Sequence, residues 1–475
     1  MRSWKRRLRK IWRGWVMAGE WRKVSFEKLL AEPVRNGIYK AKEFHGRGAK
    51  IVNMGELFAY PRLRSVPMKR VELSASEESR FLLADGDLIF ARRSLTAEGA
   101  GKCSVVLQLD EPTTFESSII RARPDKSKAN SLYLYYFFNS PSGLHALDTI
   151  RRQVAVAGIT GSDLAKLEIP TPHLEEQRAI ARILGVLDDK IDLNRRINQT
   201  LEAMAQAIFK SWFVDFDPVK AKIAAIEQGE DSPRAAMRAI SGKTDAEIDQ
   251  MPREHHDQLA ATAALFPDAM EESELGDIPK GWNIKSVADL ARYGVGKTAV
   301  SSLTIETYIS TENMIENRGG VGRASSLPVV SAVPSFKKGQ VLISNIRPYF
   351  KKIWMARFDG GRSNDVLCFE AKEEGCQEFI YNLLYQDDFF EFMMRTSKGA
   401  KMPRGDKDAI AGWTFPCASP ELRCAFSERV RPFYLHIENL NLECRHISAL
   451  RDTLLPKLLC GELKVPSNLS NEEGQ

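Results

Sequence analysis

The feature that most constrains this chain is a run of apolar and small residues at alternating steps of four and three, between positions 180 and 212. A period of about 3.5 residues is typical of a helix that supercoils against another helix. Two asparagines in the middle of this seam would penalise a slipped register once they are buried. The seam positions are Ile180, Leu184, Leu187, Ile191, Asn194, Asn198, Leu201, Ala205, Ile208 and Trp212.

The seam recurs 246 residues later, so we expect the partner helix in the same chain. Two departures should weaken the copy, namely Arg451 on the seam and Pro432, which should kink the second helix or delay its start. Two unrelated amphipathic helices would have to match at ten positions by chance, so a tandem repeat is favoured. The repeated positions are Phe426, Val430, Phe433, Ile437, Leu440, Cys444, Ile447, Arg451, Leu454 and Leu458.

The segments that precede the two helices contain short apolar runs broken by Gly, Pro and Asn. In the first segment, IVNMGEL, DGDLIFARRS, KCSVVLQL and SSIIRA predict strands, and SLYLYYFFN predicts a helix over 131–139. The second segment repeats this order loosely with TYISTENM, GQVLISNIRP and the aromatic run QEFIYNLLYQDDFFEFMMR. We therefore expect two globular units with one fold and diverged surfaces.

Composition limits the class of protein. The formal net charge of +6 permits a polyanionic partner without requiring one. Seven scattered cysteines without a CxxC pair indicate reduced thiols and a cytoplasmic location. No apolar run in the sequence is long enough for a membrane span, so we expect no membrane association.

No catalytic or cofactor motif stands out in the sequence. The tripeptide Gly296-Lys297-Thr298 resembles the end of a phosphate-binding loop, but Ala291 occupies the place of its first glycine. No Gly-rich methyl-donor loop follows a predicted strand, and we interpret Asp215 and Asp217 as part of a turn rather than as metal ligands. We expect no catalytic residue, no metal and no cofactor in this chain.

Basic residues gather at turns in matching places of the two globular segments. A solvated charge run would rarely recur in this way, so the pattern favours a nucleic-acid surface on loops held by a rigid scaffold. The candidate DNA-binding residues are Arg92, Arg93, Arg151, Arg152, Arg347, Lys351, Lys352, Arg395, Lys398, Lys401 and Arg404.

Several stretches resemble the specificity subunits of type I restriction-modification systems. They are the helix entry IPTPHLEEQRAI, the run LDDKIDLNRRINQTLEAMAQAIFKSWFVDFDPVKAK, the segment LFPDAMEESELGDIPKGW and the run LRDTLLPKLLCGEL near the end. The resemblance extends over residues 20–463. The second helix entry, FPCASPELRC, is a degenerate version of the first.

The resemblance implies an α+β fold in which two similar target-recognition domains are joined by two long helices that form an antiparallel coiled coil with pseudo-two-fold symmetry. It implies a non-catalytic subunit that binds a bipartite, asymmetric double-stranded DNA site, one half per domain. A helix of about 30 residues, about 45 Å long, would suit half-sites about one DNA turn apart. The implied partners are two methyltransferase subunits, which modify adenine N6, and restriction/translocase subunits. These partners would use S-adenosylmethionine, ATP and Mg.

Shifts in composition divide the chain into seven segments. The first is interpreted as a phosphate-gripping arm, a membrane-surface helix or a translation start placed too early, and the segment between the repeats as a charged tether with a short helix or two. The segments are the basic N-terminal extension 1–19, target-recognition domain 20–168, helical region 169–216, charged linker 217–273, second target-recognition domain 274–414, C-terminal helical region 415–463 and polar tail 464–475.

Three other interpretations are open at this point. A single-chain nuclease or methyltransferase would need a donor or metal motif, which the sequence lacks. A coiled-coil scaffold without DNA binding would leave the matched basic turns unexplained. A specificity polypeptide from a silent or recombining cassette would have the same sequence features, and only its neighbouring genes would distinguish it.

Overall fold

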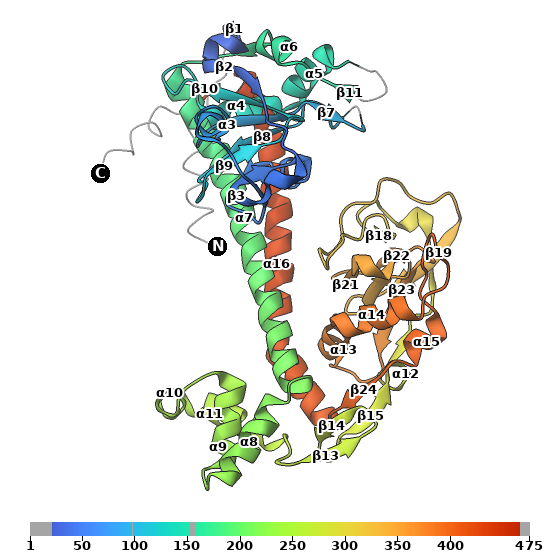
Figure 1. Ribbon diagram of the computed structural model, residues 1–475. Helices are drawn as coiled ribbons and strands as arrows, with labels where there is room; N and C mark the ends of the chain where they lie inside the picture. Colours follow the sequence, from blue (N-terminus) through green and yellow to red (C-terminus); the bar gives the residue numbers. More distant parts are fainter. Residues whose placement is uncertain (1–20, 97, 153–156, 466–475) are drawn as a thin grey trace. The chain divides into compact units, whose positions relative to one another are not determined.

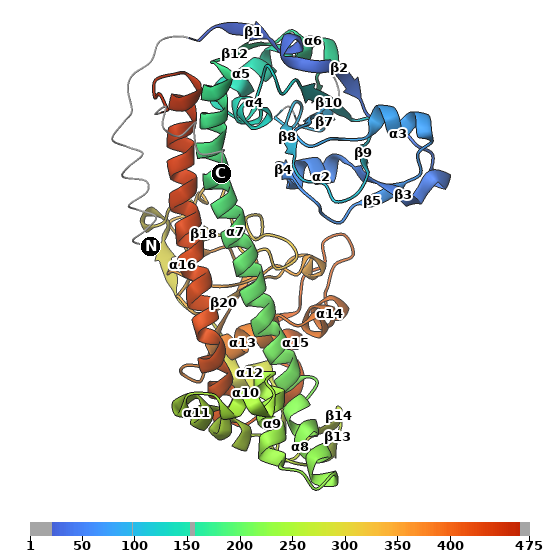
Figure 2. The same cartoon turned by 90° about the vertical axis from the view of Figure 1, so that its left-hand side faces the viewer.

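The computed structural model describes residues 21–96, 98–152 and 157–465, which form two compact units. Unit 1 contains the described residues up to 194 and from 443 onwards, and unit 2 contains residues 195–442. Two long helices, α7 (Leu174–Phe213) and α16 (Pro420–Leu459), contribute one part to each unit. Within each unit the segments of α7 and α16 lie side by side and run antiparallel (Figures 1 and 2). The extension 1–19 and residues 466–475 of the predicted tail lie outside the described residues.

Helix α7 begins where the sequence predicts, whereas α16 begins earlier than Pro432 suggests. Helix α7 follows strand β12 (Glu168–Pro170) and carries Glu175 and Glu176 in its first turn, where the helix dipole favours negative charge. Helix α16 continues through Pro432, so the predicted late start is wrong. Pro432 is exposed, which leaves the carbonyl group that loses its N–H partner open to water, while Val430 and Tyr434 on the buried face hold the helix in place.

Unit 1 is built on a five-stranded sheet of order β2-β10-β6-β8-β4, accompanied by a three-stranded sheet of order β5-β3-β9. Helix α4 lies close to α7, and the smaller sheet lies farther away (Figure 2). The strands are β1 (Lys23–Ser25), β2 (Leu30–Asn36), β3 (His45–Val52), β4 (Arg62–Leu63), β5 (Lys69–Val71), β6 (Leu88–Ala91), β7 (Arg93–Ser94), β8 (Cys103–Val106), β9 (Thr113–Phe115), β10 (Ile119–Pro124) and β11 (Ala157–Gly158). The helices are η1 (Phe26–Leu29), η2 (Lys42–Phe44), α2 (Met54–Ala59), α3 (Ala75–Phe81), α4 (Ser131–Phe138), α5 (Pro141–Ile150) and α6 (Gly161–Ala165).

Unit 2 contains a four-stranded sheet of order β16-β23-β20-β21, which matches the order β2-β10-β6-β8 of unit 1. The prediction that the two globular units share one fold is therefore confirmed. The strands are β15 (Asn283–Ser286), β16 (Ala291–Tyr293), β17 (Lys297–Ala299), β18 (Tyr308–Ile309), β19 (Ala332–Phe336), β20 (Val341–Ser344), β21 (Ile353–Met355), β22 (Gly360–Arg362), β23 (Val366–Ala371) and β24 (Thr414–Cys417). The helices are α12 (Val287–Leu290), η3 (Val300–Ser302), η4 (Pro348–Phe350), α13 (Gln377–Leu384), α14 (Asp387–Arg395) and α15 (Lys407–Ala411).

The helical half of the repeat recurs without insertion or deletion. The two seams are related by an offset of 246 residues. Adding this offset to the first residues of α4, α5, α6 and α7 gives the first residues of α13, α14, α15 and α16. The strands vary more, since that offset from the start of β6 falls on Pro334, whereas β20 begins only at Val341. The offset from the start of β10 falls on Asp365, directly before β23. The repeat is therefore constant where each globular unit meets its helices and variable in length among the strands.

The segment over 217–273 is folded, which corrects the expectation of a tether. Ala236, Met237, Ile248 and Ala263 form a small apolar core, because the helices that carry them are amphipathic and pack on one another. Trp212 of α7 also stacks edge-on against Phe266, with ring centroids 5.3 Å apart. The elements are α8 (Asp217–Glu227), α9 (Ser232–Ser241), α10 (Asp245–Asp249), α11 (Arg253–Ala264) and the hairpin β13 (Met270–Ser273) and β14 (Gly276–Pro279).

Two local predictions need adjustment. In IVNMGEL the strand ends at Val52 and helix α2 begins at Met54, because Asn53 and Glu56 form a capping box. The aromatic run of unit 2 forms two helices, α13 and α14, with a new first turn at Asp387. The run SLYLYYFFN forms helix α4, as predicted.

Candidate nucleic-acid interface

The predicted basic turns of unit 1 lie together at the exit of strand β6. The chain leaves this buried strand at Arg92, whose carbonyl oxygen accepts the N–H of Ile159 at 3.0 Å. Strand β7 then pairs with β11, and Arg152 exchanges two backbone hydrogen bonds with Gly158, of 2.9 and 3.2 Å. Tertiary structure therefore brings Arg92 and Arg93 next to the turn that carries Arg151 and Arg152.

Unit 2 repeats this arrangement at the exit of strand β20. Lys398 and Arg404, which occupy the places of Arg152 and Gly158 in the repeat, exchange two backbone hydrogen bonds of 2.9 Å. The carbonyl oxygen of Asn345 accepts the N–H of Gly405 at 3.0 Å, as Arg92 accepts that of Ile159 in unit 1. Each closing pair encloses five residues of the sequence, so the two units carry matching backbone closures at matching positions of the repeat.

Side-chain contacts divide the eleven candidate cations into three groups. Five have a carboxylate partner, whereas Arg92, Lys352 and Arg395 contact carbonyl groups or rings. Arg93, Arg347 and Lys401 are exposed and have no carboxylate partner within the described part of the chain. The five pairs are Arg151–Asp148, Arg152–Asp163, Lys351–Asp387, Lys398–Asp406 and Arg404–Asp365.

Sequence reasoning missed Arg318, which organises the turn next to Lys351. Its guanidinium donates to the carbonyl oxygen of Tyr385, lies 4.7 Å from the centroid of that ring and pairs with Asp387. Arg318 and Lys351 together lower the pKa of Asp387, Arg318 having the larger effect. Lys351 therefore has a carboxylate partner within unit 2. The run Asn317-Arg318-Gly319-Gly320 is typical of a turn, and it could have drawn attention to Arg318 in the sequence.

The helix seam is largely buried. In unit 1 the side chains of Ile180, Leu184, Leu187, Ile191, Asn194, Ile447, Leu454 and Leu458 are buried. In unit 2 the side chains of Ala205, Trp212, Phe426, Val430, Ile437 and Leu440 are buried, and those of Leu201, Ile208 and Phe433 are partly buried.

Polar residues at the middle of the seam are paired within each unit. In unit 1 the Asn194 amide donates to Glu443 at 3.0 Å, and Lys190 lies 3.4 Å from the same carboxylate. In unit 2 the Asn198 amide donates to Asn441 at 2.8 Å. A shifted register would separate these partners, as expected for buried asparagines in a coiled coil.

Arg451, expected to be a defect of the seam, takes part in a buried polar cluster. It donates to Asp188 Oδ1 at 2.7 Å, and the Tyr136 hydroxyl donates to Asp188 Oδ2 at 2.7 Å. Burial, with the charge of Asp188, raises the pKa of Tyr136. The expectation was wrong because the partner of Arg451 lies 263 residues away in sequence. Tyr136, Asp188 and Arg451 are called the Asp188 cluster below.

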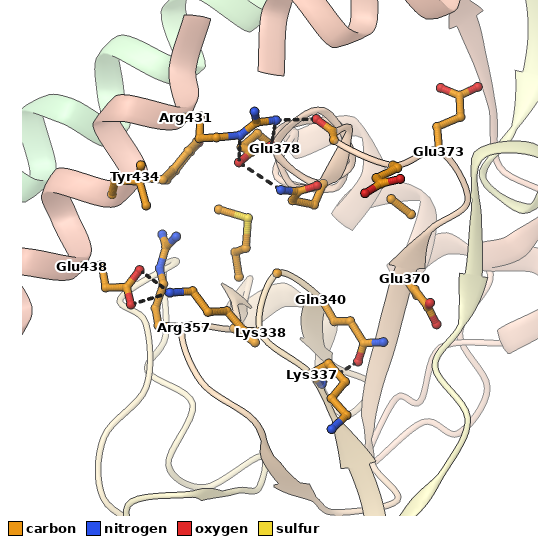
Figure 3. Close-up of a pocket in the computed structure, with 18 residues that line it drawn as sticks. Lys337, Lys338, Gln340, Arg357, Glu370, Glu373, Glu378, Arg431, Tyr434 and Glu438 are labelled. Atoms are coloured by element: carbon orange, nitrogen blue, oxygen red, sulfur yellow. Dashed lines mark hydrogen bonds and ion pairs between the residues drawn. The ribbon is translucent and has the colours of Figure 1, made fainter. Parts of the chain in front are cut away.

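A polar pocket of about 400 Å³ lies in unit 2 between the globular part and α16 (Figure 3). Lys338 pairs with Glu438 at 2.8 Å and Arg431 with Glu378 at 3.1 Å. The Arg357 guanidinium lies 5.2 Å from the centroid of the Tyr434 ring. The lining ion pairs thus connect the globular part of unit 2 to its helix.

The described residues contain no group of three or more His, Cys, Asp or Glu side chains placed to hold a metal ion. Lys297 opens strand β17 instead of preceding a helix, unlike the lysine of a phosphate-binding loop. Phe216, between Asp215 and Asp217, has a left-handed backbone with φ of 58°, so FVDFDP forms a turn. Among the described helices none is long and apolar enough to cross a membrane.

The fold and the loops define a protein with two similar α+β units, each mounted on an antiparallel helix pair. Residues 35–203 match the family described as Type I restriction modification DNA specificity domain. The HindI specificity subunit of Haemophilus influenzae is 30% identical over 354 residues, which cover 70% of this chain and 77% of that protein. The MjaIX specificity subunit of Methanocaldococcus jannaschii is 24% identical over 363 residues, which cover 70% of this chain and 69% of that protein.

Among solved structures, the S subunit of a type I restriction-modification system from M. genitalium is 14% identical, with a TM-score of 0.48 over 92% of this chain and 96% of that chain. On the sequence matches, the chain belongs to the specificity subunits of type I restriction enzymes. Its role is DNA sequence recognition, and it is a non-catalytic component of such an enzyme.

Proposed function

We propose that the chain binds a bipartite, asymmetric duplex DNA site, with one half contacted by each unit. The observation that carries the proposal is the pair of equivalent backbone closures, Arg152–Gly158 and Lys398–Arg404, which stand at corresponding positions of the repeat. The closures match, but the residues between them in the sequence differ, with QVAVA in unit 1 and GAKMP in unit 2. Since base edges are distinguished by side-chain donors, acceptors and apolar groups, two such different sequences favour two different half-sites.

The helix pairs are proposed to act as a spacer between the half-sites and to position two methyltransferase subunits and the restriction/translocase subunits. S-adenosylmethionine, ATP and Mg would be bound by those partners. Modification of adenine N6 in duplex DNA requires the base to be flipped out, so this chain would hold the duplex while a partner extracts the target. None of the seven cysteines is in a disulfide, which supports action in the reducing cytoplasm.

The proposal is tested by co-expressing the chain with its neighbouring methyltransferase gene and sequencing host DNA for modified adenines. We expect a split, asymmetric motif with a gap of constant length. Replacing residues 20–168 by those of a relative should change one half of the motif and leave the other half and the gap unchanged. A continuous or palindromic motif would contradict the proposal. A stable complex that modifies no DNA would favour the silent-cassette interpretation.

A further inference from the structure

We propose that residues 399–403 of unit 2, called the 399–403 loop, contact base edges, whereas Arg347 beside the loop holds a backbone phosphate. This inference rests on the proposed function and makes it more specific, because it names the side chains that determine one half of the site.

The 399–403 loop is held at its base by the backbone. The reciprocal hydrogen bonds between Lys398 and Arg404 close it, and the bond from the Gly405 N–H to the Asn345 carbonyl joins it to the end of β20. A Cβ added at Gly405 would lie 2.6 Å from Asn345 Oδ1 and 2.8 Å from Ile410 Cδ1, so a larger residue there would have to displace these side chains. The loop is therefore presented in one orientation before any ligand binds, which lowers the entropic cost of recognition.

The tip of the loop is open to solvent. Residues 399–402 are all exposed, and 52% of Met402 is accessible although its side chain is large and apolar. Gly399 has φ of +96°, a backbone conformation that favours glycine and turns the chain outwards at the start of the loop. The loop thus displays an ammonium group and a thioether on a rigid base.

Charge pairing separates the cations around this loop. Lys398 pairs with Asp406 at 2.5 Å and Arg404 with Asp365 at 2.8 Å, so each of the two basic residues at the base has a carboxylate beside it. Lys401 at the tip has no carboxylate partner among the residues described. Arg347 also has none, and its N–H donates to the Pro403 carbonyl oxygen at 2.8 Å, which places its backbone against the loop. Two cations are therefore available to DNA, one on the loop and one beside it.

The side-chain types fit two different contacts. A lysine ammonium in the major groove donates to O6 and N7 of guanine, and an apolar side chain contacts the methyl group of thymine. Arginine forms bidentate hydrogen bonds with phosphate oxygens as well as with guanine, and we assign Arg347 to a phosphate because its backbone lies beside Pro403 at the base of the loop and not at the tip. We expect Lys401 to select a guanine, Met402 to favour a thymine, and Arg347 to contribute affinity without selecting a base.

The test uses the full chain in complex with its methyltransferase partner, with genome-wide sequencing of modified adenines and DNA binding measured at several salt concentrations. The variants are Lys401→Ala, Met402→Ala and Arg347→Ala. Their controls are Lys280→Ala and Arg429→Ala, which remove exposed cations of unit 2 away from the loop. Lys401→Ala should reduce discrimination at one guanine of one half-site by about 10- to 100-fold and leave the other half unchanged.

Arg347→Ala should weaken binding to all sequences equally and reduce the slope of log K against log salt by about 0.9. Unchanged base preference at every position in both Lys401→Ala and Met402→Ala would overturn the inference while leaving a split motif, and hence the proposed function, intact. A wild-type motif that is not split would reject the proposed function itself. A changed base preference in Arg347→Ala would overturn the division of roles.

Discussion

Three corresponding positions of the two repeats carry different chemistry where each globular part meets its helices. In unit 1 they form the Asp188 cluster, in which a buried carboxylate accepts from a tyrosine and an arginine. The corresponding residues of unit 2 are Asn382, Tyr434 and Ala205, and the Asn382 amide donates to the Tyr434 hydroxyl at 2.9 Å. One repeat therefore uses an ion pair and the other a neutral hydrogen bond. The comparison shows that this junction requires paired polar groups, not a particular charge.

A second difference concerns the helix entries. The buried Gln177 amide donates to the Pro172 carbonyl oxygen at 3.0 Å, which ties the first turn of α7 to the chain before it. The degenerate second entry has Arg423 at the corresponding position, and its guanidinium donates to the Ala418 carbonyl oxygen and pairs with Glu373. The second motif thus keeps the connection with a longer, charged side chain.

The largest change in the free energy of unfolding is expected from a charged residue introduced into the helix seam. Leu187→Asp would bury a charge on a side chain that is 3% exposed and should destabilise unit 1 by at least about 4 kcal/mol. The corresponding Phe433→Asp in unit 2 should cost less, because Phe433 is only partly buried. Val186→Asp, at a position 51% exposed, is the control. Urea unfolding measures the difference. Full-length-site binding by a folded Leu187→Asp variant would contradict the role of the helix pair as a spacer.

Removing one member of the Asp188 cluster should have the next largest effect. Arg451→Ala leaves the buried Asp188 carboxylate without its cation and should lower the free energy of unfolding by about 2–4 kcal/mol. Adding Tyr136→Asn and Asp188→Tyr to that variant installs the residues of unit 2 and should restore much of the loss. Thermal unfolding of the single and triple variants tests this. If the triple variant is less stable than Arg451→Ala alone, the polar residues of the two units are not interchangeable at this junction.

The helix entries should respond more weakly. Gln177→Ala leaves buried backbone groups unpaired and should cost about 1–3 kcal/mol. Arg423→Gln should cost less than Gln177→Ala, since glutamine makes the corresponding bond in unit 1. Hydrogen exchange at the first turns of α7 and α16 locates the change. A larger loss in Arg423→Gln would show that the pair with Glu373, and not the link to the preceding chain, stabilises the second entry.

The smallest expected effect is the pH dependence that Glu202 gives to the stability of unit 2. Burial raises the pKa of Glu202 above its ordinary value of 4.5, although the Tyr381 hydroxyl donates to it at 2.5 Å and opposes the shift. Because the folded state then binds the proton more tightly than the unfolded chain, the unfolding free energy falls as pH rises from 4.5 through the raised pKa. Glu202→Gln should equal or exceed the wild type in stability at about pH 7.5 and lose that advantage near pH 4.5. An advantage that grows on acidification would give the opposite sign and refute the assignment.

Much of the architecture could be predicted from local spacing. The seam, its recurrence later in the chain and the aromatic helix α4 depend on residues near one another in sequence, where helical periodicity acts. The segment over 217–273 was misjudged because its core of Ala236, Met237, Ile248 and Ala263 is too small and dispersed to stand out in a charged composition. Lys351 was predicted to be available to DNA, whereas Asp387 pairs with it across 36 residues.

The sequence by itself determined the tandem repeat, the pairing of two long helices and the family, since heptad spacing and motif order are properties of the chain in one dimension. Only the tertiary structure decided that Arg451 pairs with Asp188 at the seam, and that Lys398 and Arg404 have carboxylate partners while Lys401 and Arg347 have none among the described residues. The physical reason is that an ion pair depends on the distance between two side chains in space. Asp188 and Arg451 show this, because 263 residues of chain separate two atoms that lie 2.7 Å apart.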